Sequence, residues 1–200
     1  MSIELTAVQR KILSFALFGA AGCFVAALVG ELWLSATWRA PIVQKQPLAV
    51  CLLLDCSGSM SGPKLAEVKA AAVSFVQRHQ GSKDEIAIVG FGSQVHLAAP
   101  LSTQHAGLQT AINSLTDGGG TNMAAGLRAA LAQLQTSERP GNVLLFTDGQ
   151  PNSQPDALQA AGECRAQAVK IVAVATEGAD TSYLGTVTDD PTLVIAVKNL

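Results

Sequence analysis

Short apolar runs alternate with helical patterns from residue 48 onward, and this alternation constrains the fold more than any other feature. The clearest runs are LAVCLLL (48–54), EIAIVGF (85–91) and NVLLFT (142–147). Continuous apolar runs of this length are typical of strands in a parallel sheet that is covered on both faces. Further runs at 169–175 and 192–197 indicate the last strands, and residues 93–98 suit a short edge strand.

Helical spacing of apolar residues appears between these runs. It predicts helices over 64–79, around 108–115, over 123–134 and from Pro155 to about 164, with a short helix before the last strand. Strands and helices in alternation predict an α/β fold with a doubly wound, mostly parallel sheet that is flanked by helices. Ligands of such sheets bind beyond the carboxyl ends of the strands.

The N-terminal part of the chain departs from this pattern. Residues 12–30 contain no charged side chain, and Glu31 is the single charged residue within 12–34. A helix over 12–34 would be about 34 Å long, enough to cross a hydrocarbon core of about 30 Å. A cleaved signal peptide and a buried core helix are the alternatives, but a signal peptide usually has a shorter apolar region. The expected organisation is a tail (1–11), a transmembrane helix (12–34), a tether (35–47) and a globular domain (48–200).

The chain is therefore expected to be a single-pass membrane protein. Arg10 and Lys11 adjoin the apolar segment and favour an N-terminus on the cytoplasmic side. The cysteines of the domain (Cys51, Cys56, Cys164) lack paired spacing and read as free thiols, which favours a reducing compartment for the domain instead. The two indications conflict, and we expect the domain on the cytoplasmic side. Net charge is −2 without a basic stripe, which excludes a nucleic-acid partner.

Oxygen-bearing side chains follow two of the apolar runs. Asp55, Ser57 and Ser59 stand at alternate positions after the first run, and Asp148 follows NVLLFT. Thr121 comes after three glycines and immediately precedes a predicted helix. Carboxylate and hydroxyl oxygens that converge on one point suit a hard cation such as Mg²⁺. Two alternatives remain: the serines could cap the next helix, and Asp148 could be a turn residue.

The segments DCSGSM, GGGTN and FTDG resemble the metal-ion-dependent adhesion site of von Willebrand factor type A (VWA) domains. The resemblance extends from residue 48 to about 196 and implies the VWA fold. It implies that one Mg²⁺ or Mn²⁺ is surrounded by Asp55, Ser57, Ser59, Thr121 and Asp148. It also implies that a partner protein completes the metal shell with an Asp or Glu carboxylate.

The chain departs from the family pattern at its last strand. A closing helix normally follows that strand in VWA domains, yet the sequence ends at VIAVKNL. We expect either that this helix is dispensable or that something else covers that face of the sheet. Cys56 stands between two proposed ligands and is interpreted as a packing residue, and Asp117 is interpreted as a turn residue.

The expected function is a membrane-anchored VWA module that mediates metal-dependent protein–protein interaction, without enzymatic activity. A structural subunit of a membrane complex is the first alternative, because Gly22, Ala26 and Gly30 form a stripe suited to helix packing in lipid. A Mg²⁺-dependent phosphotransferase that uses Asp55 as nucleophile is the second. That chemistry calls for another carboxylate at position 57, where this chain has Ser57.

Overall fold

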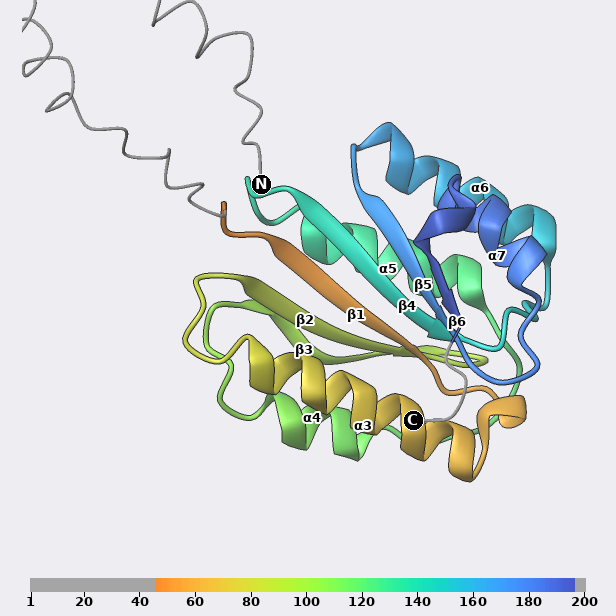
Figure 1. Cartoon of the computed structure of the whole chain (residues 1–200), viewed down its shortest axis with the longest axis horizontal. Helices are drawn as coiled ribbons and strands as arrows, with labels where there is room; N and C mark the ends of the chain where they lie inside the picture. The colour runs from red at the N-terminus through yellow and green to blue at the C-terminus, as the bar shows by residue number, and fades with distance from the viewer. Residues whose placement is uncertain (1–45, 197–200) are drawn as a thin grey trace, which may run out of the picture. The chain divides into compact units, whose positions relative to one another are not determined.

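The computed structural model describes residues 46–196, and the predicted tail, transmembrane helix and most of the tether lie outside this range. Within the described range, no helix is long and apolar enough to cross a membrane. The described strands form one sheet in the order β3-β2-β1-β4-β5-β6. Their bounds are β1 (Ala49–Asp55), β2 (Glu85–Phe91), β3 (Val95–Ser102), β4 (Gly141–Thr147), β5 (Lys170–Ala175) and β6 (Val194–Ala196) (Figure 1).

The sheet is mostly parallel, as predicted. All pairs of neighbouring strands are parallel except β2 and β3, which form an antiparallel hairpin. The register between β2 and β3 shifts in the stretch between Ile86 and Val89, so the outer strand is irregular there. The edge strand predicted over 93–98 is longer in the structure and reaches Ser102.

Five α-helices connect the described strands, and two short 3₁₀ helices flank loops. Their bounds are η1 (Gly58–Met60), α3 (Pro63–Arg78), α4 (Leu108–Ser114), α5 (Met123–Leu134), α6 (Gln154–Ala166), α7 (Thr181–Thr188) and η2 (Pro191–Leu193). Helix α3 begins one residue before the predicted Lys64, because Gly62 at its N-cap has a φ of 75° and Pro63 suits the first turn. The last strand is shorter than predicted, since Pro191 and its neighbours form η2.

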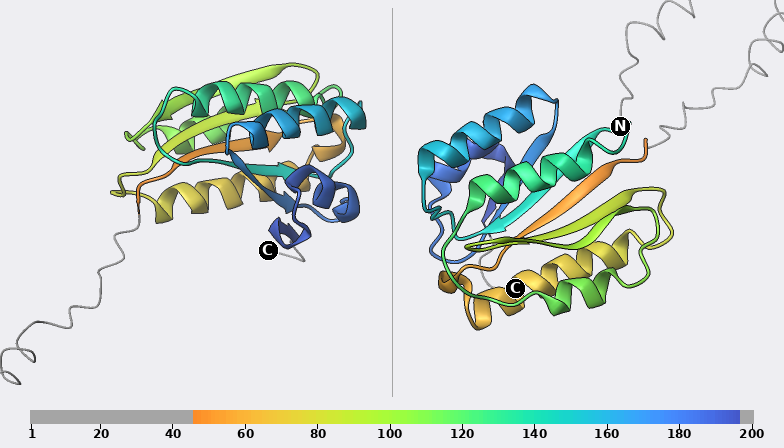
Figure 2. Two further views of the ribbon diagram at one scale, coloured as in Figure 1. Left: turned by 90° about the horizontal axis from the view of Figure 1, so that it is seen from above. Right: turned by 180° about the vertical axis from the view of Figure 1, so that it is seen from behind.

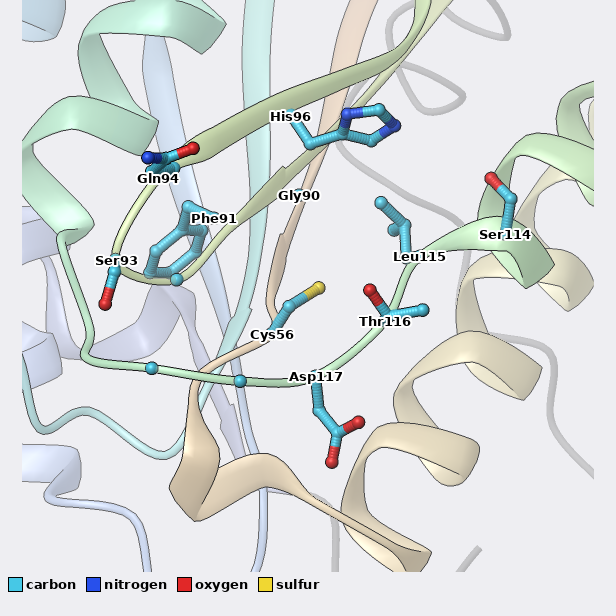
Figure 3. Close-up of a pocket in the computed structure, with 13 residues that line it drawn as sticks. Cys56, Gly90, Phe91, Ser93, Gln94, His96, Ser114, Leu115, Thr116 and Asp117 are labelled. Atoms are coloured by element: carbon cyan, nitrogen blue, oxygen red, sulfur yellow. The ribbon is translucent and has the colours of Figure 1, made fainter.

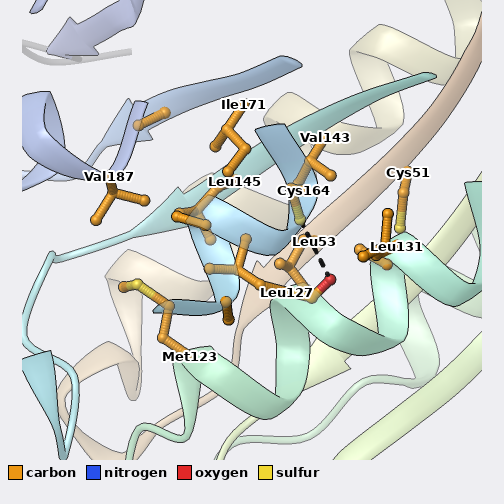
Figure 4. Packing of buried hydrophobic residues seen from close by; sticks show 14 of the residues in the cluster. Cys51, Leu53, Met123, Leu127, Leu131, Val143, Leu145, Cys164, Ile171 and Val187 are labelled. Atoms are coloured by element: carbon orange, nitrogen blue, oxygen red, sulfur yellow. Dashed lines mark hydrogen bonds between the residues drawn. The ribbon is translucent and has the colours of Figure 1, made fainter. Parts of the chain in front are cut away.

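Helices lie on both faces of the sheet (Figure 2). On one face, α5, α6 and α7 pack on the strands in a cluster that includes Leu53, Leu145 and Leu127 (Figure 4). On the other face, α3 and α4 pack on a second cluster that includes Leu52 and Ile88. The strand residues of the two clusters alternate along β1, which explains why its sequence is apolar throughout.

The order of the strands reverses between β1 and β4. From β1 the chain moves outward through β2 to β3 and then returns to β4 on the other side of β1. A crevice forms at such a reversal, beyond the carboxyl ends of the two strands. Asp55 is the last residue of β1, and Asp148 directly follows β4, so both carboxylates are placed at this point.

Candidate metal centre

Asp55 is held rigidly at the carboxyl end of β1. Its side chain is fully buried, and both carboxylate oxygens accept hydrogen bonds. The amide of Ser57 donates to Oδ1 at 2.9 Å, and the hydroxyl of Thr147 donates to Oδ2 at 2.7 Å. Burial raises the pKa of Asp55, the bonds from Thr147 and Ser57 lower it, and the nearby negative charge of Asp148 raises it; the net shift is upward. Two acidic groups therefore lie close together in a buried place.

The serines after β1 face each other. The hydroxyl oxygens of Ser57 and Ser59 are 3.1 Å apart, with Ser57 buried and Ser59 exposed. Neither serine caps a helix: Ser57 precedes η1 without a side-chain cap bond, and α3 has Gly62 at its N-cap. The capping alternative is therefore wrong for both residues, and their hydroxyls are available for another role.

The glycine loop before Thr121 is tied to the serine loop by backbone hydrogen bonds. The amide of Gly58 donates to the carbonyl of Gly119 at 3.0 Å, and the amide of Gly118 donates to the carbonyl of Cys56 at 2.9 Å. A Cβ on Gly58 would lie 3.3 Å from the Gly119 carbonyl oxygen, and Gly119 itself has a φ of 78°. Glycine at these positions thus permits the close approach of the two loops.

A third loop, after β4, joins the other two. The amide of Thr121 donates to Oδ1 of Asn152 at 2.8 Å, and the amide of Asn152 donates to the Thr121 carbonyl at 2.9 Å. Asp148 is 3% exposed and accepts a bond of 3.3 Å from the amide of Gln150, which is turn geometry. Interlocking of the three loops brings all the predicted ligands to one edge of the sheet.

Sequence reasoning missed two residues that hold this arrangement together. Thr147 orients Asp55 and also accepts a bond from the Gly149 amide at 3.0 Å, while Asn152 fixes the loop of Thr121. Thr147 precedes Asp148 at the end of a largely apolar strand, and threonine is common in strands. A polar residue at the fully buried end of a strand was the signal available.

The donor set fits a hard divalent cation. Within the described residues, neither Asp55 nor Asp148 forms an ion pair with a basic side chain. Residues 46–196 contain no group of three or more His, Cys, Asp or Glu side chains that could hold a metal. The side chains present at this edge offer carboxylate and hydroxyl oxygens, which suit Mg²⁺ and Mn²⁺ rather than softer metals.

A pocket of about 500 Å³ adjoins the glycine loop (Figure 3). It is lined by Cys56, His96, Leu115 and Asp117, together with residues of the β2–β3 turn and Gly118 and Gly119. Cys56 belongs to the apolar cluster beneath α3, and burial raises the pKa of its thiol to about 11. Its thiol is therefore protonated at neutral pH, in agreement with its interpretation as a packing residue.

Comparison with known proteins identifies the fold independently. The uncharacterized protein sll0103 of Synechocystis is 30% identical over 111 residues, which are 54% of this chain and 26% of that protein. The magnesium-chelatase 60 kDa subunit of Cereibacter sphaeroides is 29% identical over 124 residues, 60% of this chain and 22% of that subunit. The chain thus spans about a quarter of the length of these relatives.

Solved structures share the architecture at low sequence identity. The pilus adhesin SpaC of Lactobacillus rhamnosus GG superimposes with a TM-score of 0.69 at 18% identity, covering 78% of this chain and 28% of SpaC. At this identity the likeness concerns the fold alone. A family model of the von Willebrand factor type A domain matches residues 49–200, which is most of the sequence. The chain therefore belongs to the von Willebrand factor type A domain family.

Proposed function

We propose that the chain is an interaction module that binds Mg²⁺ or Mn²⁺ and, through the metal, an acidic side chain of a partner protein. The proposed metal ligands, direct or through water, are Asp55, Ser57, Ser59, Thr121 and Asp148. Two carboxylates would balance the charge of the cation, and neutral hydroxyls would add coordination without further charge. The bound metal would supply a Lewis-acidic position for an incoming Asp or Glu carboxylate.

One observation carries this proposal: Asp55 and Asp148 lie buried and close together without a basic partner in the described residues. Adjacent buried carboxylates repel each other, and a cation between them removes that cost. The chain itself provides the positioning. Thr147 fixes the orientation of Asp55, and the backbone bonds between the three loops hold the hydroxyls at the same edge.

The membrane part of the proposal rests on the sequence of residues 12–34, with the VWA domain on the cytoplasmic side. Such an anchor would hold the module beside partners in the same membrane. The small-residue stripe of Gly22, Ala26 and Gly30 would allow the anchor to pack against another transmembrane helix. A structural subunit assembled through that stripe is the alternative function.

We propose a binding role rather than an enzymatic one. An aspartyl phosphotransferase requires a carboxylate oxygen that can attack phosphorus. Both oxygens of Asp55 accept hydrogen bonds within the chain, and the side chain is fully buried. This supports a positioning or ligand role for Asp55. The relative named as a magnesium-chelatase subunit shares only 22% of its length with this chain, so its activity is not carried over.

Thermal unfolding of the full-length chain tests the metal site. After treatment with EDTA, addition of Mg²⁺ or Mn²⁺ to about 100 times its dissociation constant should stabilise the folded state by about 2.7 kcal/mol. For a chain of this size that corresponds to a rise in Tm of roughly 5–10 °C. Asp148→Asn should abolish the rise, while Asp156→Asn, at an exposed position in the first turn of α6, should retain it.

An equal rise in the Asp148→Asn variant would show that the metal binds elsewhere. Binding of Mn²⁺, followed by its electron paramagnetic resonance signal, gives a second readout that does not depend on stability. Partner binding is then tested by pull-down from native membranes with and without EDTA. Partners that remain bound to both the chelated protein and the Asp148→Asn variant would contradict a metal-bridged contact.

A further inference from the structure

The two faces of the sheet are covered unequally in the described residues. Helices α5, α6 and α7 contribute to the core on one face, whereas α3 and α4 lie on the β1, β2 and β3 side of the other (Figure 1). On that second face the strands β4, β5 and β6 present apolar side chains that are only partly covered. Leu144 and Val174 are half-buried, and Ile195 is 52% exposed.

The sequences of these strands indicate that this surface is normally covered. Residues 143–146 (VLLF) and 171–174 (IVAV) are apolar on both sides of the strand, not only on the side that faces α6. A strand with one solvated face alternates apolar and polar residues, and these do not. The uncovered side thus has the composition of a core surface, in contrast to isolated apolar residues that commonly occur on protein surfaces.

The surface is hollowed into a groove of about 570 Å³ between α3 and the three strands. One wall is the flank of α3, where Ala70, Ala71 and Ser74 are small. The floor is formed by side chains of β4, β5 and β6 that include Leu144, Val174 and Ile195. Small residues on a helix allow a second helix to pack at a short interaxial distance. The groove follows α3, whose 16 residues correspond to a length of about 24 Å.

The two ends of the groove carry opposite charges. Arg78 and His79 lie at the end of α3, and the side chain of Arg78 forms no ion pair with any described residue. A separate small hollow shares Ala71, Phe146 and Val174 with the groove, and Glu67 and Glu177 line this hollow. Both glutamates are exposed and likewise have no ionic partner within residues 46–196. An occupant would therefore need an acidic end beside Arg78 and a basic end beside the glutamates.

We propose that this groove binds an amphipathic α-helix of a partner protein, with its apolar stripe on Leu144, Val174 and Ile195. Acidic residues of that helix lie beside Arg78, and basic residues lie beside Glu67 and Glu177. A helix fits better than an added strand, because the groove lies on the face of the sheet, where the main-chain groups already pair within the sheet. The proposal does not depend on metal binding at the carboxyl end of β1.

The test uses the full-length chain and a fluorescein-labelled synthetic helical peptide of 18 residues. The peptide has a leucine stripe, glutamates in its first turn and lysines in its last turn, which also suits the helix dipole. Binding is measured by fluorescence anisotropy. Ile195→Asp should weaken binding about tenfold or more, since it places a charge against the apolar stripe. Leu97→Asp is the matched control: Leu97 is 46% exposed on β3, outside the groove, and binding should not change.

Charge reversal tests the orientation. Arg78→Glu should weaken binding of this peptide by about threefold to fivefold, the range for an exposed ion pair that becomes repulsive. A second peptide with lysines at both ends should bind the Arg78→Glu variant more tightly than it binds the wild-type chain. Failure of this rescue would overturn the assigned orientation of charge.

Three results would overturn the proposal itself. The first is equal affinity of the wild-type and Ile195→Asp chains for the peptide, and the second is no binding to the wild-type chain. The third is a concentration-dependent dimer, seen by sedimentation velocity, that Ile195→Asp abolishes and Leu97→Asp preserves. That dimer would assign the groove to a second copy of this chain instead of to a partner helix.

Discussion

Replacement of Thr147 by valine should destabilise the chain because the hydroxyl of Thr147 makes two buried hydrogen bonds. It donates to Oδ2 of Asp55 at 2.7 Å and accepts from the amide of Gly149 at 3.0 Å. Thr147 is fully buried, so water cannot replace either bond without a rearrangement. Valine has nearly the same shape as threonine, and the substitution therefore removes the polar contacts without leaving a cavity.

The size of this destabilisation follows from the two groups that Thr147 bonds, the Asp55 carboxylate and the Gly149 amide. A hydrogen bond to a charged group contributes about 1.5–3 kcal/mol, and a buried amide left unsatisfied costs a further 1–3 kcal/mol, roughly. Partial relaxation of the loop reduces the sum, so we expect Thr147→Val to lower the free energy of unfolding by about 2–4 kcal/mol. Thr147→Ser keeps the hydroxyl and loses one buried methyl group, for which we expect about 1 kcal/mol.

Urea unfolding of the full-length variants in EDTA measures this difference without a contribution from bound metal. With an m-value of about 2 kcal/mol/M, the midpoint of Thr147→Val should lie roughly 1–2 M below that of the wild-type chain. The m-values of all three chains must agree for the comparison to hold. A Thr147→Val chain as stable as the Thr147→Ser chain would refute the assignment of Thr147 as the residue that orients Asp55.

Two further predictions concern packing and attachment. Gly126→Ala should destabilise the chain by about 1–3 kcal/mol in urea unfolding, because its Cβ would lie 2.9 Å from the buried ring of Phe91. Gly162→Ala, whose Cβ would meet nothing closer than 3.8 Å, should instead leave stability unchanged or raise it by up to about 1 kcal/mol; destabilisation there would contradict the packing argument. The full-length chain should stay in the membrane pellet after carbonate extraction, while deletion of residues 1–34 should move it to the supernatant. A well-folded deletion variant that remains in the pellet would indicate another attachment.

The fold could be predicted from the sequence because burial leaves a strong periodic signal. The runs at 48–54 and 85–91 are apolar without interruption, and both are central strands of the sheet. Boundaries were less accurate where local chemistry decides them. Pro191 converts the start of the last predicted strand into η2, and the hairpin strand β3 extends beyond the residues that showed strand character.

The candidate site could be predicted only in part. Asp55, Ser57 and Asp148 stand next to buried strands, and their position in the sequence implies where they lie. Thr147 and Asn152 act through contacts between segments far apart in the sequence, such as the bond of Thr147 to Asp55. No periodicity records such contacts, because they depend on how the three loops meet after the sheet has formed.

The irregular hairpin at one end of the sheet has a consequence for solubility during folding. An outer strand exposes a row of main-chain groups that can pair with a strand of another molecule. Strand β3 contains Pro100, and its register shifts against β2. Both features interrupt the row of main-chain hydrogen-bond donors and acceptors along this strand. Strand β3 thus discourages edge-to-edge aggregation of newly made chains, a protection that matters for a domain with so many apolar strands.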